Sequence, residues 1–556
     1  MYKPPILFVQ GNVYSRMAGG DDETAKYVAL TCHYDVTYYQ RSGNGRSGRR
    51  GYGSWKSDRV NLGDAKRFPS GFTPMLVKAL RGRGYEVSVY TTSKRPQKVF
   101  NWPVPGARPS NPMVAYPHQI EAITKAYESG RGVLQIPTGG GKTPIAMWLV
   151  QKLGVEVLYI VPNKLLLDQV YGDFFNEFGG SQVGRIGDGE FSPGYITIST
   201  VQTLWSRRES PEVRALLGRV QCLIIDECHT LGSIRDYSLI GKGRDGNTWY
   251  EVASACNAFF RIGLSATPRD RGEVDGGALR GMTGPVLVNM NTSNLIDGGY
   301  LAPPDVHVYR VKVSQSYSNY RMTYDNAIVK NPLRNKLIVG LCTGLASMGK
   351  IVLVTVSRVD SHGRVLYDAL QQTMGDEVAA IFGSTSTPDR EDILKKFRSR
   401  EIKVLVGTVF KLGFNVKALD AIVLADAGKK EQSVVQRVGR VLRHVHGKRA
   451  IVIDFLDDDG GLAKRHSLYR LKYYLSEPAF SVRTTGFDPF EMVKEHPEIF
   501  DPWSLQEDDK RRVMVEGSIC ALDRDYYQKS GKRQGKPFII KASVDIAKEA
   551  ISGKHA

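Results

Sequence analysis

Paired cysteines, long apolar runs and internal repeats are missing from this chain, and each absence excludes a class of protein. The six cysteines are scattered, with no C-x-x-C pair and no spacing to histidine that suits zinc. This excludes a disulfide framework and favours a reduced, intracellular chain. No run of about 18 apolar residues is present, and the apolar stretch near the N-terminus is too short for a signal peptide. We therefore expect a soluble protein without a membrane partner.

Acidic residues are also in short supply. The chain has 57 Asp and Glu against 76 Lys and Arg, which gives a formal net charge of +19 and an isoelectric point near 9.5. Such a surplus favours a polyanionic partner, above all a nucleic acid, over a neutral small molecule. A chain of 556 residues is too long for one hydrophobic core, because domains usually have about 100 to 200 residues. We expect three or four domains.

The positive charge is concentrated near the N-terminus. Residues 1–105 hold 17 Lys and Arg against 7 Asp and Glu, and the apolar pattern predicts a small basic α+β module with a strand over 27–39 and a helix and strand over 72–90. Residues 38–59 read YYQRSGNGRSGRRGYGSWKSDR, where aromatic rings can stack on bases and arginines can follow phosphates. This stretch is either a DNA-binding element or a basic surface loop without a defined role. The proline-rich segment 94–112 is expected to be a linker.

A glycine-rich loop lies between an apolar strand pattern and an amphipathic helix pattern. It reads QIPTGGGKT, residues 135–143, and its context of strand, loop and helix predicts a phosphate-binding loop. Backbone N–H groups of its glycines can close around an anion, the Lys142 ammonium can reach the β and γ phosphates, and the Thr143 hydroxyl can hold Mg²⁺. The strict pattern has glycine where this chain has Ile136.

From residue 113 to 311, apolar strands alternate with amphipathic helices, which is typical of a parallel sheet with helices on both faces. Polar groups at the carboxyl ends of such strands meet along one rim, where ligands bind. The apolar strand CLIID ends in Asp226 and is followed by Glu227. Asp226 can bind Mg²⁺ through water, and Glu227 can orient and deprotonate an attacking water. Together with Lys142 they predict hydrolysis of a nucleoside triphosphate.

The next two residues, Cys228 and His229, allow a metal-site interpretation, but no other ligand is suitably spaced. We favour a role for His229 in coupling between domains.

A second alternation of strands and helices, over about 300–476, has no phosphate loop with a lysine. It contains EQSVVQRVGRVLR, residues 431–443, in which Arg437, Arg440 and Arg443 recur every three residues and so lie on one side of a helix. Arginines on a second domain that face a nucleotide on the first can stabilise the transition state, a contribution of about 10³ to 10⁵ in rate. We expect Arg440 and Arg443 to complete the catalytic site.

The ordered set of motifs resembles the superfamily 2 helicases over residues 114–475. Gln119 is similar to the adenine-reading Q element, PTGGGKT to motif I, VPNKLLLDQ and STVQTL to motifs Ia and Ib, and DECH to motif II. SATP is similar to motif III, VGTVFKLGFN to motif V and QRVGRVLR to motif VI. VGRIGDG (183–189), NPLRN (331–335) and the VIDF strand look most like the UvsW-type phage branch-migration DNA helicases and their XPB-like relatives.

The resemblance implies two tandem RecA-like parallel-sheet domains that use ATP and Mg²⁺, and it implies a role for each matching residue. The implied catalytic residues are Lys142, Glu227, Gln436, Arg440 and Arg443. The implied Mg²⁺ ligands are Thr143 and Asp226. The implied nucleotide contacts are Gln119, Pro137, Thr138, Gly139, Gly140, Gly141, Lys142, Thr143, Gly413 and Asn415. The implied nucleic-acid contacts are Asn163, Lys164, Thr200, Gln202, Arg358 and Thr408. The implied coupling residues are His229, Ser265 and Thr267.

Three positions depart from the family pattern. They are Ile136, Tyr116, where arginine is common, and Asn415, where aspartate is usual. These departures concern the adenine and ribose contacts and leave the hydrolytic residues intact.

We therefore expect an α/β chain of four parts. These are a basic N-terminal DNA-binding module (1–105), a first RecA-like domain (106–299), a second one (300–476) and a C-terminal extension (477–556). The extension is expected to contain helix and loop without chemistry. It either packs on the second domain or makes an additional DNA or protein contact.

The expected function is that of an ATP-dependent DNA helicase or translocase. Its expected substrate is branched or duplex DNA with single-stranded segments, such as forks, D-loops and Holliday junctions in replication, recombination or repair, in the cytoplasm of a bacterium or a phage-infected cell. An RNA helicase remains an alternative, although DECH differs from the DEAD tetrapeptide of RNA-remodelling enzymes. An ATP-gated nucleic-acid clamp without unwinding is a second alternative. The motor subunit of a restriction system has no support, since neither flank shows a nuclease motif.

Overall fold

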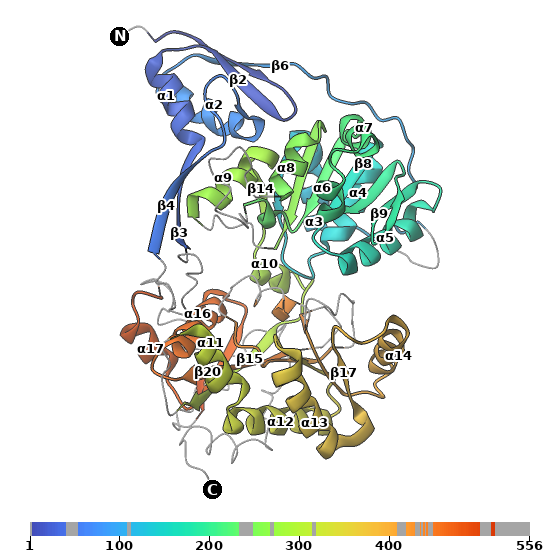
Figure 1. The fold of residues 1–556 in the computed structure, drawn as a ribbon, viewed down its shortest axis with the longest axis vertical. Coiled ribbons are helices and arrows are strands. Elements are labelled where there is room, and N and C mark those ends of the chain that lie inside the picture. Colours follow the sequence, from blue (N-terminus) through green and yellow to red (C-terminus); the bar gives the residue numbers. More distant parts are fainter. Residues whose placement is uncertain are drawn as a thin grey trace, which may run out of the picture. The chain divides into compact units, whose positions relative to one another are not determined.

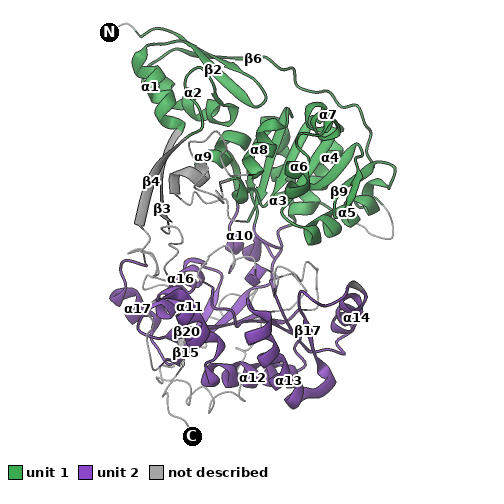
Figure 2. Cartoon of the chain, in the orientation of Figure 1, with its two compact units in different colours: residues 1–136, 141–289 green, residues 137–140, 290–556 purple. Residues whose placement is uncertain are grey.

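The computed structural model describes residues 3–40, 54–107, 113–232, 248–266, 272–313, 319–408, 419–428, 434, 437–439, 441–442, 449–500 and 513–516. The chain divides into two compact units, one of residues 1–136 with 141–289 and the other of residues 137–140 with 290–556 (Figure 2). The division into four domains stays a prediction. Within the described ranges, no helix is both long enough and apolar enough to cross a membrane.

The first unit begins with a small α+β module, residues 3–91, called here the N-terminal module (Figure 1). Its four-stranded sheet has the order β5-β2-β1-β6, and its hydrophobic core contains Phe8, Phe68, Phe72 and Leu76. The hairpin of β3 and β4 is a separate two-stranded sheet. The elements are β1 (Ile6–Gln10), β2 (Tyr14–Gly19), α1 (Asp22–Thr31), β3 (His33–Gln40), β4 (Ser54–Asn61), β5 (Phe68–Pro69), η1 (Ser70–Phe72), α2 (Thr73–Gly82) and β6 (Val87–Thr91).

The strand predicted over 27–39 is wrong in its first part, because residues up to Thr31 belong to helix α1. The Asp21 side chain accepts the Thr24 N–H at 2.8 Å, and the Thr24 hydroxyl accepts the Asp21 N–H at 2.9 Å. This capping box starts a helix that the apolar pattern alone did not reveal. The helix and strand over 72–90 are confirmed. Most of the basic stretch, residues 41–53, lies outside the described residues, so its role stays a prediction.

The N-terminal module packs on the rest of the first unit through helix α9 (Gly272–Thr283). Gly71 lies so close to this helix that a Cβ on it would stand 1.9 Å from the carbonyl oxygen of Arg280. Val13 and Leu62 of the module pack against the hydrophobic core of the large sheet that follows. The module is therefore part of the first unit and not a tethered arm.

The expected linker contains no helix or strand over 92–107, but it is anchored along its length. The N–H groups of Val99 and Phe100 donate to the Gly154 carbonyl at 2.8 and 2.9 Å. The Phe100 ring stacks on the buried Trp102 ring, with 4.6 Å between centroids. The segment connects the N-terminal module to the next sheet as a packed strap.

The large sheet of the first unit has the order β10-β9-β11-β8-β12-β13-β7-β14 and is parallel except for the pair β9 and β10. Its central strands are buried on both faces, which explains their continuous apolar sequences. The strands are β7 (Arg131–Gln135), β8 (Val157–Val161), β9 (Val183–Gly187), β10 (Glu190–Ser192), β11 (Ile196–Thr200), β12 (Cys222–Asp226), β13 (Phe260–Ser265) and β14 (Val286–Asn289). The helices are α3 (Pro117–Ser129), α4 (Lys142–Leu153), α5 (Lys164–Phe178), α6 (Val201–Ser206), α7 (Pro211–Arg219), η2 (Cys228–Gly232), α8 (Thr248–Ala255) and α9.

The second unit contains a parallel sheet of order β17-β18-β16-β19-β20-β15-β21-β22. The expected fold of two RecA-like parallel sheets is thus confirmed. The strands are β15 (Pro304–Lys312), β16 (Val352–Thr355), β17 (Val378–Ile381), β18 (Val404–Gly407), β19 (Ala421–Leu424), β20 (Ala450–Asp458), β21 (Ser481–Thr485) and β22 (Val513–Glu516). The helices are α10 (Thr292–Asp297), α11 (Tyr320–Thr323), η4 (Tyr324–Val329), α12 (Pro332–Ser347), η5 (Val359–Gly363), α13 (Arg364–Met374), η6 (Gly375–Glu377), α14 (Thr387–Arg398), α16 (Leu462–Ser476) and α17 (Pro489–Glu495).

The extension after residue 477 was expected to be helix and loop, and this is wrong for two segments. Strand β21 pairs in parallel with β15, and β22 pairs in parallel with β21. Val482 and Thr484 of β21 are fully buried, so a five-residue run that is too short to show a pattern becomes a strand through its tertiary contacts. These two strands of the extension complete the second sheet, and for the described part of the extension this agrees with the packing alternative.

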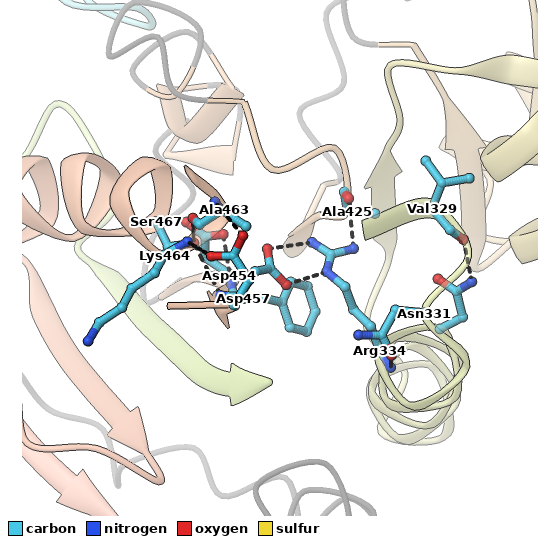
Figure 3. Close-up of polar contacts among 12 residues, drawn as sticks. Val329, Asn331, Arg334, Ala425, Asp454, Asp457, Ala463, Lys464 and Ser467 are labelled. Carbon is cyan, nitrogen blue, oxygen red and sulfur yellow. Dashed lines mark hydrogen bonds and ion pairs between the residues drawn. The ribbon is translucent and has the colours of Figure 1, made fainter. Parts of the chain in front are cut away.

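Buried ion pairs link the helices of the second unit to its sheet. Arg334 of α12 donates to the Asp457 carboxylate at 2.7 Å and to the Ala425 carbonyl at 2.8 Å, and both charged side chains are fully buried (Figure 3). Arg470 of α16 pairs with Asp454 at 2.8 Å. Because an unpaired buried charge is costly, each pair fixes its helix on the strand beside it.

Candidate active site

The predicted phosphate loop follows strand β7 and leads into helix α4. Ile136, the departure from the strict pattern, is fully buried and donates its N–H to the Ser265 carbonyl at 2.9 Å. It therefore extends the strand, where a glycine is not needed. Gly139 and Gly141 both have φ of +88°, a conformation that favours glycine. Residues 137–140 group with the second unit, so the site below is built from residues of the first unit.

Lys142 begins helix α4 and faces the carboxylate of Glu227. Its Nζ lies 3.3 Å from Glu227 Oε1, and the two side chains are only 14% and 16% exposed. Burial alone would lower the pKa of the ammonium, but Glu227 and Asp226 outweigh burial and raise it. Lys142 is therefore held as a cation where the sequence places it, at the carboxyl end of the sheet.

The two acidic residues after β12 differ in their electrostatics. Burial raises the pKa of Asp226 above its ordinary value, and the Glu227 charge adds to this rise. Burial also acts to raise the pKa of Glu227, but the Lys142 charge and the contact with His229 outweigh it and lower that pKa. Glu227 is thus ionised in the folded chain, as a residue that accepts a proton from water must be.

The backbone at Glu227 is strained in a way that aims its side chain. Its φ is +49°, which non-glycine residues rarely adopt and which often marks functional sites. The Glu227 N–H donates to Asp226 Oδ1 at 2.9 Å, and the Thr230 hydroxyl donates to the Glu227 carbonyl at 2.9 Å. These two hydrogen bonds hold the turn that brings Glu227 to Lys142.

His229 joins two motifs of the first unit. Its Nδ1 lies 3.3 Å from Glu227 Oε2 and 3.1 Å from the Ser265 hydroxyl at the end of β13. The structure brings together the predicted coupling residues His229 and Ser265, while Thr267 lies outside the described residues. Their coupling role stays a prediction.

Gln119 lies against the start of helix α4. It is buried, and its Oε1 accepts the Tyr116 N–H at 2.9 Å. A Cβ on Gly141 would stand 2.2 Å from Gln119 Nε2, so glycine is needed there. The Tyr116 ring is 51% exposed and stacks beside His118. Adenine contact by Gln119 stays a prediction.

Four of the predicted nucleic-acid residues lie at the carboxyl ends of β8 and β11, which are neighbouring strands. Asn163 caps helix α5 by accepting the Leu166 N–H at 3.0 Å, so part of its polar capacity is structural. Lys164 is exposed and pairs with Asp188 at 2.5 Å. The Thr200 hydroxyl lies 2.9 Å from that of Thr203.

Gln202 links these two strand ends, because its Nε2 donates to the Pro162 carbonyl at 3.1 Å.

In the second unit, Arg358 follows β16, pairs with Asp325 and lies 4.9 Å from the Tyr324 ring centroid. Thr408 follows β18 and has a buried hydroxyl without a hydrogen-bond partner among the described residues. The nucleic-acid contacts of all six residues stay predictions.

Several predicted residues of the second unit lie outside the part of the chain that the structure describes. They are Gly413, Asn415, Gln436, Arg440 and Arg443. Arg437, the first arginine of the same row, is described. It is 4% exposed and pairs with Asp426 at 2.6 Å, so it is a structural residue.

Two oxygen donors, the Thr143 hydroxyl and the Asp226 carboxylate, are available for a divalent cation. A set of oxygen donors suits Mg²⁺, which takes most of its ligands from water and phosphate in nucleotide sites. Among the described residues there is no group of three His, Cys, Asp or Glu side chains that could hold a metal ion.

Tyr159 is a site neighbour that the sequence did not reveal. It lies on β8 opposite Ile224 of β12 and is fully buried. Burial, and then the nearby Asp226, raise the pKa of its hydroxyl well above the ordinary value, so it stays protonated. A tyrosine inside an apolar strand gives no sequence signal for this position.

Two family models match parts of the two parallel sheets. The family model described as the type III restriction enzyme, res subunit, matches residues 112–270. The model described as the helicase conserved C-terminal domain matches residues 334–445.

Similar proteins are about a quarter identical to this chain over the residues that align. The ATP-dependent DNA helicase uvsW of Enterobacteria phage T4 is 26% identical over 365 residues, covering 62% of this chain and 68% of that protein. The DNA 3'-5' translocase XPB2 of Sulfurisphaera tokodaii is 27% identical over 377 residues, covering 61% and 80%. The crystal structure of T4 UvsW aligns with 86% of this chain and 99% of its own, at 21% identity and a TM-score of 0.38.

Both family matches fall in order on the two parallel sheets, and each of the two relatives named above covers about three fifths of this chain. The chain is therefore an ATP-hydrolysing helicase, and it resembles the superfamily 2 helicases UvsW and XPB.

Proposed function

We propose that this protein is an ATP- and Mg²⁺-dependent DNA helicase or double-strand translocase that remodels branched DNA. The observation that carries the hydrolytic part is the cluster of Lys142, Asp226 and Glu227, with the lysine charged and Glu227 ionised in one partly buried site. Forks, D-loops and Holliday junctions are the branched structures that we have in view.

Each residue of this cluster has a distinct role. Lys142 binds the terminal phosphates of ATP and offsets their charge, while Glu227 orients the attacking water and accepts its proton. Thr143 and Asp226 hold Mg²⁺, which neutralises phosphate charge when it is bound. Gln119 recognises the adenine, and Arg440 and Arg443 of the second unit complete the charge stabilisation.

DNA as the substrate is supported by charge and by relatives. The net charge of +19 favours a polyanion, and two of the similar proteins are named a DNA helicase and a DNA translocase. The branched form of the DNA is supported by the resemblance to the UvsW type. The phage relative also supports action in the cytoplasm of a bacterium or a phage-infected cell.

An RNA helicase is the second candidate, because the putative ATP-dependent RNA helicase L396 of Acanthamoeba polyphaga mimivirus is 26% identical over 396 residues. Contacts to a strand backbone do not separate DNA from RNA. The deciding experiment compares ATP hydrolysis with a four-way DNA junction, single-stranded DNA and RNA of equal length. Our proposal requires the highest rate with the junction. A higher rate with RNA would favour the second candidate.

The same experiment needs a control for the site itself. Glu227→Gln should abolish hydrolysis in every condition, whereas Glu121→Gln should leave it unchanged. Glu121 suits this purpose because it also pairs with a lysine, Lys125, but on an exposed helix face at 2.7 Å. ATP-dependent DNA binding by the wild-type chain without turnover would contradict the proposal and favour a clamp.

A further inference from the structure

The short loop after β19, residues 425–428, is held by three buried arginines of the second unit. Arg334 donates to the Ala425 carbonyl at 2.8 Å (Figure 3), and Arg470 donates to the Gly428 carbonyl at 3.4 Å. Ala427, between them, has φ of +45°, a conformation that persists only where surrounding contacts enforce it. The loop therefore has one defined shape.

The third arginine binds the side chain of this loop, Asp426, which is 2% exposed. Arg437 Nη2 lies 2.6 Å from Asp426 Oδ2. The other two guanidinium nitrogens of Arg437 are buried and have no hydrogen-bond partner among the described residues. Among the described residues, the Asp426 carboxylate thus balances the buried charge of Arg437, which would be costly to leave unpaired.

Asp426 is bound from a second direction by the end of strand β16. The Thr355 hydroxyl donates to Oδ1 at 3.1 Å, and the Ser357 hydroxyl donates to Oδ2 at 3.2 Å. Ser357 directly precedes Arg358, one of the proposed nucleic-acid contacts. One carboxylate therefore receives hydrogen bonds from two segments at once.

These two segments have different proposed tasks. Residues 355–358 end at a nucleic-acid contact, while Arg437 lies three residues before Arg440, a proposed contact to the ATP phosphates. A shift of the β16 end would change the hydroxyl donors of Asp426, and the strong charge-assisted bond would transmit this change to Arg437.

We propose that Asp426 is a positioning residue that couples nucleic-acid binding at the end of β16 to the arginine-bearing segment that completes ATP hydrolysis. This inference rests on the proposed function, because it needs a chain whose hydrolysis responds to a nucleic acid. In this inference Asp426 contacts neither ATP nor the nucleic acid, but it determines how strongly ATP hydrolysis responds to nucleic-acid binding.

The test compares ATP hydrolysis with and without a four-way DNA junction in three variants of the full chain. Asp426→Asn removes the charge and Ser357→Ala removes one hydroxyl donor. Asp305→Asn is the matched control, since Asp305 of β15 is 1% exposed and pairs with Arg449, and among the described residues it contacts neither 355–358 nor Arg437. Thermal unfolding of each variant gives its stability.

Asp426→Asn should lower the stimulated rate by about two- to thirtyfold, the range found for residues that carry coupling. Ser357→Ala should lower the stimulation while its rate without DNA equals that of the wild type. Asp305→Asn should lose stability and keep its stimulation. Full stimulation in both Asp426→Asn and Ser357→Ala would overturn the inference.

Two other outcomes also count against it. An equal loss of stimulation in Asp305→Asn would show that stability alone explains the effect. A Ser357→Ala chain that loses its rate without DNA would place the effect in the chemical step. A wild-type chain that hydrolyses ATP without any response to DNA or RNA would instead refute the proposed function, a result that the wild-type rates alone identify.

Discussion

Replacing Gly71 with alanine should loosen the docking of the N-terminal module, and the structure gives the size of this effect. The new Cβ would stand 1.9 Å from the Arg280 carbonyl oxygen and 2.6 Å from that of Gly281. Both are backbone atoms of helix α9, so no side-chain rotation relieves the contact, and the module must move away by about 1 Å. Overpacking of this kind costs about 1 to 3 kcal/mol.

Gly82→Ala in the same module is the matched control. Gly82 ends helix α2 and has no atom within 4 Å of the new Cβ, so alanine should stabilise the helix by about 0.5 to 1 kcal/mol. The two alanine variants should thus differ by about 1.5 to 4 kcal/mol. Urea unfolding followed by circular dichroism measures the difference in the first transition, because a chain of two units need not unfold in one step. Equal midpoints for the two variants would refute the argument for tight docking.

Three further predictions concern the site, the response to acid and the basic stretch. Lys142→Ala should abolish ATP hydrolysis stimulated by nucleic acid, and wild-type phosphate release from this variant would contradict the site assignment. Burial lowers the pKa of His307 to about 4 from its ordinary 6.5, so its stabilising contribution is complete above about pH 6.5 and falls as the pH drops toward 4. The urea midpoint of the wild type should therefore fall when the pH is lowered from 7.5 to 5, and the midpoint of His307→Gln should fall by less. An equal fall in both chains would contradict this. Neutralising three arginines of the basic stretch should weaken the salt dependence of DNA binding, which fluorescence anisotropy measures. The slope of log affinity against log salt concentration should become shallower by about 0.9 for each DNA phosphate that the variant no longer neutralises. An unchanged slope would show that the stretch is not part of the DNA interface. These arginines are Arg46, Arg49 and Arg50.

Much of the fold could be predicted because parallel strands buried on both faces have continuous apolar sequences. The strand ending in Asp226 is the clearest case, since its predicted and observed bounds agree. Helix α1 could not be found from apolar periodicity because a local capping box at Asp21 starts it. Strand β21 owes its conformation to β15, a partner far away in the sequence.

The candidate site was predictable where chemistry depends on local order. A lysine after a glycine-rich turn and an acidic pair after a buried strand are local signals, and the structure places Lys142 and Glu227 in contact. Long-range partners leave no such signal. Nothing in the sequence around Arg334 shows that its charge is balanced by Asp457, which lies on a different element. Contacts of this kind follow from the packing of the whole unit.

The order of strands in the second sheet has a consequence for synthesis on the ribosome. Strand β15 lies inside the sheet between β20 and β21, yet both neighbours leave the ribosome long after it. At about 5 to 20 residues per second, roughly 7 to 30 seconds separate the synthesis of β15 from that of β20, Ala450–Asp458. During that interval a strand whose Val306, Val308 and Val311 are buried in the finished sheet has neither lateral neighbour, which makes it a target for chaperones and for misassociation between nascent chains.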